Sequence, residues 1–164
     1  MPVIDVNRDL ERCTLQITSR FDAPVEAVWQ LWADPRRLER WWGPPTYPAT
    51  FVEHVLTPGG SASYYMTGPE GDRAAGWWRI IDVDAPHRLV IEDGFSHDDG
   101  TPNDDLPITV MRVVLEARAE GGSTMQIEST FSSTPAMEQM LAMGMEEGST
   151  LAIGQIDELL LESV

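Results

Sequence analysis

The sequence predicts an α+β fold: a curved seven-stranded antiparallel sheet, two short helices after the first strand, and a long C-terminal helix. Three observations predict it. The chain has 164 residues, the length of one domain, so we expect a single domain over residues 1–164. Seven segments alternate apolar and polar side chains, as half-buried strands do, and residues 135–162 repeat apolar side chains at helical spacing. With 42% hydrophobic and 23% charged residues, the composition excludes global disorder.

The first strand is predicted at residues 14–21, where Leu15, Ile17, Ser19 and Phe21 share one face. A helix follows Pro24, because apolar side chains recur there at steps of three and four residues. Its apolar stripe consists of Val25, Val28, Trp29 and Trp32. A second short helix is predicted at residues 36–42 and ends at Gly43-Pro44-Pro45.

Six further strands are predicted at residues 51–56, 62–67, 76–83, 89–95, 108–117 and 124–132. Most of their separators are short and rich in Gly, Pro and Asp, which favours antiparallel hairpins. The C-terminal segment 135–162 is predicted to be one long helix. Gly144 and Gly148 fall on its inward face, and a glycine within a helix costs about 1 kcal/mol relative to alanine. Close packing and empty space beside the helix both explain such a pair.

Ordered motifs along the chain resemble one superfamily. They lie at residues 21–24, 28–29, 32–35, 38–44, 58–60, 66–71, 83–89 and 143–148. Together they resemble the START/Bet v-type (SRPBCC, polyketide cyclase-like) helix-grip superfamily, in the branch of activator of heat-shock-protein-90 ATPase homologues. The resemblance covers about residues 12–162 and implies a sheet that grips the C-terminal helix, with a cavity between them. Ser149 replaces a Trp common in relatives, and Ala62 replaces a larger aromatic, so ligand size does not carry over.

The charge balance limits the partners. The chain has 11 basic residues, all Arg, against 27 acidic ones, for a net charge of −16. Such a chain repels phosphate backbones, so we expect no nucleic-acid partner. The N-terminal residues lack the pattern of a signal peptide, no apolar run is long enough to span a membrane, and Cys13 is the single cysteine. We therefore expect a cytoplasmic protein with no membrane partner.

Catalytic and metal sites are not predicted. The chain has three histidines that could act as a general base, His54, His87 and His97. It has no Gly-x-Ser-x-Gly motif to supply the serine nucleophile that such a base would activate. The segment 96–107 is rich in oxygen ligands, but it lacks the spacing of an EF-hand, and a charged surface loop is the favoured interpretation. We expect no catalytic residue, no metal and no cofactor.

The candidate site is a ligand cavity. Its predicted lining combines aromatic residues, methionines and helix glycines, namely Trp42, Tyr64, Met66, Trp78, Phe95, Met111, Gly144, Met145 and Gly148. Trp41-Trp42 and Trp77-Trp78 are adjacent pairs, so only one ring of each pair is expected to face the cavity. Apolar area with few polar groups is typical of small-molecule sites. The sequence thus favours a non-enzymatic protein that encloses a hydrophobic small molecule.

Two other function classes remain open at this stage. A co-chaperone-like interaction module would need an exposed apolar patch, which the second aromatic of each Trp pair could supply. An enzyme of the polyketide cyclase or hydrolase type would need a perturbed acid or base in the cavity, for which Asp93 and His54 are the candidates. The ligand and the oligomeric state are not encoded in any motif.

Overall fold

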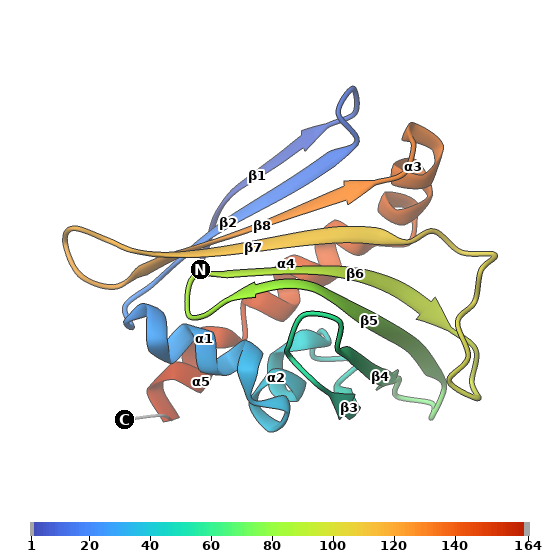
Figure 1. Cartoon of the computed structure of the whole chain (residues 1–164), viewed down its shortest axis with the longest axis horizontal. Helices are drawn as coiled ribbons and strands as arrows, with labels where there is room; N and C mark the ends of the chain where they lie inside the picture. The colour runs from blue at the N-terminus through green and yellow to red at the C-terminus, as the bar shows by residue number, and fades with distance from the viewer. Residues whose placement is uncertain (1, 163–164) are drawn as a thin grey trace.

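The computed structural model describes residues 2–162, which form one antiparallel sheet of eight strands and five helices (Figure 1). The strands are β1 (Val3–Asp9), β2 (Thr14–Phe21), β3 (Ala49–His54), β4 (Ser61–Thr67), β5 (Arg73–Asp84), β6 (Arg88–Ser96), β7 (Thr109–Ala117) and β8 (Ser123–Phe131). Their order across the sheet is β1-β2-β8-β7-β6-β5-β4-β3. The predicted α+β helix-grip class is confirmed.

The strand count differs from the predicted seven because of β1. This strand pairs with β2 at the edge of the sheet. Its side chains bury little surface, since Ile4 is 46% exposed and Val6 37% exposed. Backbone hydrogen bonds to β2, rather than burial of one face, therefore hold β1 in place. Alternation of hydropathy does not detect a strand of that kind.

The inner face of the sheet carries the core. In β2 and β8 every second residue is buried, so one face of each strand is apolar and turned toward the helices. The same alternation places Met111, Val113 and Leu115 of β7 inward. This inner face supplies one wall of the candidate site.

Two short helices connect β2 to β3, as predicted. They are α1 (Val25–Ala33) and α2 (Pro35–Trp42). The side chain of Asp34 caps α2 by accepting a hydrogen bond from the backbone N–H of Arg36, and Pro35 occupies the first turn. Trp32 of α1 and Trp41 of α2 are fully buried, with ring centroids 4.8 Å apart. This aromatic contact joins the two helices at one end of the core.

The C-terminal helix is not continuous, which corrects the prediction of one long helix over residues 135–162. It consists of α3 (Thr134–Ala142), α4 (Met145–Ile153) and α5 (Ile156–Glu162), which follow one another across one face of the sheet (Figure 1). Gly144 separates α3 from α4 with φ of +86°, a left-handed conformation that glycine adopts at no steric cost. Helical spacing of the apolar residues continues through the break, so periodicity alone conceals it. Within residues 2–162, no helix is both long and apolar enough to cross a bilayer.

Candidate functional site

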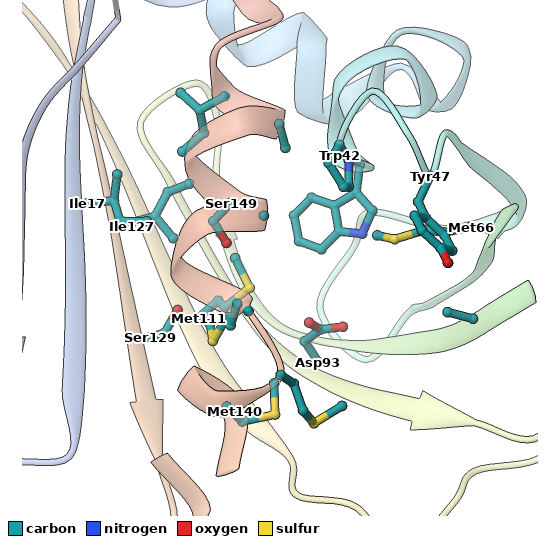
Figure 2. A pocket seen from close by; sticks show the side chains of 18 of the residues that line it. Ile17, Trp42, Tyr47, Met66, Asp93, Met111, Ile127, Ser129, Met140 and Ser149 are labelled. Carbon is teal, nitrogen blue, oxygen red and sulfur yellow. The ribbon is translucent and has the colours of Figure 1, made fainter. Parts of the chain in front are cut away.

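A cavity of about 330 Å³ lies between α4 and the inner face of the sheet (Figure 2). The backbone of α4 approaches those of α2 and α3 at more positions than it approaches any strand. Strands, helices and the loop after α2 all contribute to the lining. It consists of Ile17, Trp41, Trp42, Pro44, Tyr47, Tyr64, Met66, Ala74, Asp93, Phe95, Met111, Ile127, Ser129, Met140, Met143, Gly144, Met145, Gly148, Ser149, Ala152 and Ile153.

The structure brings eight of the nine predicted site residues to this cavity. They are Trp42, Tyr64, Met66, Phe95, Met111, Gly144, Met145 and Gly148. The ninth, Trp78, does not line the cavity. It faces inward from β5 but is 1% exposed, and the ring of Trp42 covers it with centroids 4.9 Å apart. Strand alternation predicts the face on which a side chain lies, but not which other side chain covers it.

The paired tryptophans divide between several environments. Trp42 is half-buried and forms one wall of the cavity, opposite α4 (Figure 2). Trp41 is buried, also lines the cavity, and donates a hydrogen bond from Nε1 to the carbonyl of Leu31 at 2.9 Å. Trp77 lies on the outer face of the sheet, where its ring packs over Gly94 and its Nε1 donates to the carbonyl of Phe95 at 3.1 Å. The expectation of one cavity-facing ring in each pair is therefore wrong, because both Trp41 and Trp42 line the cavity and neither Trp77 nor Trp78 does.

The α4 wall of the cavity is built from small side chains. Gly148, Ser149 and Ala152 lie on this wall. A Cβ added to Gly148 would meet no atom within 4 Å, so open space lies beside it. Gly144 has a different role, because its positive φ produces the break between α3 and α4. Of the two glycines expected within the helix, only Gly148 lies inside one.

The polar centre of the cavity is a hydrogen bond between Tyr64 and Asp93. The hydroxyl of Tyr64, on β4, donates to Oδ1 of Asp93, on β6, at 2.9 Å. Burial raises the pKa of Asp93 to about 7, and the hydrogen bond from Tyr64 and the nearby Trp78 indole oppose this shift. Asp93 is half-buried, and it lines the cavity. Its carboxyl is therefore largely removed from bulk water although part of the side chain is accessible.

Tyr64 remains a neutral donor at physiological pH. Burial, and then the charge of Asp93, raise the pKa of its phenol well above the usual value. The indole N–H groups of Trp42 and Trp78 approach this pair, Trp42 from the side of Tyr64 and Trp78 from that of Asp93. Neither indole closes a hydrogen bond of ordinary geometry. The groups around Asp93 are thus donors.

Two further hydrogen bonds fix the rim. Tyr47, in the loop after α2, donates from its hydroxyl to Oδ2 of Asp72 in the β4–β5 turn at 2.8 Å. Gln155, after α4, donates from Nε2 to the carbonyl of Gly43 at 2.8 Å. These bonds tie the loop after α2 both to the sheet and to the C-terminal helical segment. Trp42 directly precedes Gly43, the first of these two attachment points along the chain.

The other candidate side chains from the sequence lie elsewhere. His54 packs against Trp78 and hydrogen-bonds the carbonyl of Trp32 at 3.0 Å, outside the cavity lining. The segment 96–107 is exposed, and its Asp99 accepts hydrogen bonds from Thr101. Within residues 2–162, no three His, Cys, Asp or Glu side chains gather closely enough to hold a metal ion.

Several lining residues were not among the predicted site residues. Asp93 is expected only as a candidate acid or base of an enzyme, and its position between Ile91 and Phe95 on one strand face places it in the cavity. Ser149 and Ala152 follow Gly148 and Met145 on the helix, and helical spacing could have identified them. Tyr47 and Pro44 lie in a loop, where neither helical nor strand periodicity applies.

The chain is similar to known proteins, both by a family model and by solved structures. Residues 22–161 match the model of the family described as Activator of Hsp90 ATPase homolog 1-like protein. The crystal structure of protein Ms6760 from Mycobacterium smegmatis shares 48% identity, with a TM-score of 0.90 and coverage of 97% of each chain. A solution NMR structure of a protein from Arthrobacter aurescens shares 50% identity, with a TM-score of 0.93 and coverage of 98% of this chain and 92% of that one. A search of curated proteins gives no significant match.

Proposed function

The chain belongs to the Activator of Hsp90 ATPase homolog 1-like family, within the START/Bet v-type helix-grip superfamily, and we propose that it is a binding protein for an apolar small molecule. The molecule is enclosed between α4 and the inner face of the sheet. The observation that carries this proposal is the cavity itself, at about 330 Å³ and with a mainly apolar lining. Small-molecule sites typically have volumes of about 300–1,000 Å³ and combine apolar area with a few convergent polar groups.

The composition of the cavity wall supports binding over a packed core. Methionines supply much of the apolar wall, and their flexible thioether side chains adapt to ligands of different shape. Those in the lining are Met66, Met111, Met140, Met143 and Met145. The α4 wall has glycine, serine and alanine where a larger side chain would fill the space. Both features keep room for a guest molecule.

The other two function classes receive less support. An interaction module would need exposed apolar area from the Trp pairs, yet Trp42 and Trp77 are half-buried against other parts of the fold. An enzyme would need a perturbed acid or base in the cavity, and of the two candidates only Asp93 lines it. His54 hydrogen-bonds the carbonyl of Trp32 outside the lining, so it cannot act as the partner of Asp93 in general acid–base catalysis there. We therefore favour binding as the function.

Titration with prodan, a neutral dye whose emission shifts in apolar surroundings, tests the proposal. Wild-type protein is expected to bind prodan and shift its emission to shorter wavelength. Ser149→Phe places a large ring in the cavity and should weaken binding at least about tenfold, which corresponds to about 1.4 kcal/mol. Leu151→Phe is the matched control, because Leu151 lies on the same helix but is 50% exposed. Absence of binding to the wild type, or equal binding by both variants, would contradict the proposal.

A further inference from the structure

We infer that the cavity selects lipophilic amines in their ammonium form, with the carboxylate of Asp93 as the anionic partner. This inference rests on the proposed function and adds the chemical class of the ligand. It is carried by the placement of one carboxyl group in an apolar cavity, where its polar neighbours are hydrogen-bond donors and no arginine is among the lining residues. Figure 2 shows the Asp93 carboxyl pointing into the space between Trp42 and α4.

Asp93 accepts one hydrogen bond of ordinary geometry, so the carboxyl keeps acceptor capacity for a ligand. Oδ1 accepts from the hydroxyl of Tyr64 at 2.9 Å, and the indole N–H of Trp78 approaches the carboxyl without completing a hydrogen bond of ordinary geometry. The nearby polar groups are the Tyr64 hydroxyl and the indoles of Trp42 and Trp78, and an indole N–H is only ever a donor. Donor surroundings match a carboxylate acceptor better than a carboxylic acid.

The cavity contains no protein cation for this carboxylate. The titratable side chains in its lining are Tyr47, Tyr64 and Asp93, and none of the 11 arginines is among the lining residues. Burial raises the pKa of Asp93 to about 7, so the group is poised between its two forms near neutral pH. A buried unpaired charge is costly, and an incoming ammonium group would pair with it.

The aromatic rings of the cavity lining also suit an organic cation. Trp42, Tyr47, Tyr64 and Phe95 line the cavity, and an ammonium group is attracted to the face of an aromatic ring within about 6 Å of its centroid. The methionines then receive the apolar part of the molecule. A net charge of −16 attracts cations toward the protein before they bind. A carboxylic acid ligand would instead place a second acid beside Asp93.

Isothermal titration with three compounds of one skeleton tests the inference: phenylbutylamine, phenylbutanol and phenylbutanoate. At about pH 8 and physiological salt, the amine should bind the wild type at least about tenfold more tightly than the alcohol, and the carboxylate should bind most weakly. Asp93→Asn should abolish the preference for the amine. Asp98→Asn, which removes an exposed acid from the 96–107 loop, should retain it.

A second measurement uses the wild type alone and does not depend on the folding of a variant. The ratio of amine to alcohol affinity should fall about tenfold from about pH 8 to about pH 5, as Asp93 becomes neutral. The tyrosines in the lining stay neutral over this range, α4 presents no titratable side chain to the cavity, and His54 is separated from it by Trp78.

The outcomes separate the two proposals. If the alcohol binds as tightly as the amine, or the ratio does not change with pH, the amine inference is overturned and apolar binding stands. A preference that persists in Asp93→Asn would also overturn it, because surface charge would then be its source. If neither the amine nor the alcohol nor prodan binds, both the inference and the proposed function are wrong.

Discussion

Tyr64 reaches Asp93 by lying across Gly76. In the sheet register Tyr64 of β4 stands opposite Gly76 of β5, while Asp93 lies on β6, the next strand along. A Cβ at position 76 would lie 2.5 Å from both Cζ and the hydroxyl oxygen of Tyr64. The missing side chain therefore lets the phenol span β5 and donate to the carboxyl group beyond it.

Replacement of Gly76 by alanine should displace the Tyr64 ring and break its hydrogen bond with Asp93. The ring cannot move freely, because it stacks on Phe51 with centroids 5.0 Å apart and touches the edge of Trp42. We expect a loss of roughly 1–3 kcal/mol in the free energy of unfolding, measured with urea, together with weaker prodan binding.

Gly94→Ala is the matched control for Gly76→Ala. A Cβ there would lie 2.4 Å from the ring of Trp77, on the opposite face of the sheet. This variant should also lose stability but should bind prodan as the wild type does. If Gly76→Ala is as stable as the wild type and binds prodan equally well, Gly76 does not determine the position of Tyr64.

Asp93 should make the protein less stable as pH rises. The folded chain holds the Asp93 proton up to about pH 7, whereas the unfolded chain releases it near the usual value of 3.8. Between these pH values the folded state binds more protons, so the free energy of unfolding falls with rising pH. The difference in pKa corresponds to at most roughly 4 kcal/mol, and water in the cavity lowers this figure.

Comparison of wild type with Asp93→Asn isolates this contribution. Burial lowers the pKa of His54, and that effect has the opposite sign, because stability is lost as pH falls below the usual value of 6.5. Both proteins contain His54, so its effect cancels in the difference. Urea unfolding should show the variant gaining stability relative to the wild type from about pH 4 to about pH 7. A difference that does not vary with pH would place the Asp93 carboxyl in water.

Salt should stabilise the protein modestly. The net charge is −16, because the 11 basic residues are too few to balance the 27 acidic ones. Several surface arginines form ion pairs, such as Arg40 with Glu162 at 2.8 Å, but exposed pairs contribute little. Screening of the repulsion should raise the thermal midpoint between low and physiological salt. A midpoint that falls would show that the ion pairs outweigh the net repulsion.

The sequence predicts the inner face of the sheet well, because burial of one strand face has a period of two. This period predicts that Tyr64, Met66 and Met111 face the cavity, and all three line it. The period of burial along one strand does not predict which residue of another strand a side chain will contact. The bond between Tyr64 and Asp93 depends on the register of three strands and on the missing side chain of Gly76.

Local backbone conformation is the second feature that the pattern of apolar residues does not predict. Gly144 continues the helical spacing of the C-terminal segment, yet its positive φ ends α3 and begins α4. The pattern of apolar residues does not predict β1, because Ile4 and Val6 stay exposed at the sheet edge. In both cases the backbone determines the element, through its φ angle at Gly144 and through hydrogen bonds to β2 in β1. The pattern of apolar side chains does not predict either feature.

Replacement of Gly148 by leucine separates an open cavity from a tight helix–sheet contact. The new side chain would grow into space that holds no atom within 4 Å of the Cβ position. It would also recover most of the glycine penalty of about 1 kcal/mol within α4. We therefore expect the thermal midpoint to be kept or raised while prodan binding is lost.

Gly148→Ala gives the matched control, because it gains helix propensity but fills little of the cavity. It should raise the midpoint and retain prodan binding. In a tightly packed contact, the leucine would instead overpack the helix against the sheet and lower stability by roughly 1–3 kcal/mol. The two arrangements thus predict opposite signs in one melting experiment, and a large drop in the midpoint of Gly148→Leu would show that α4 has no open space beside this residue.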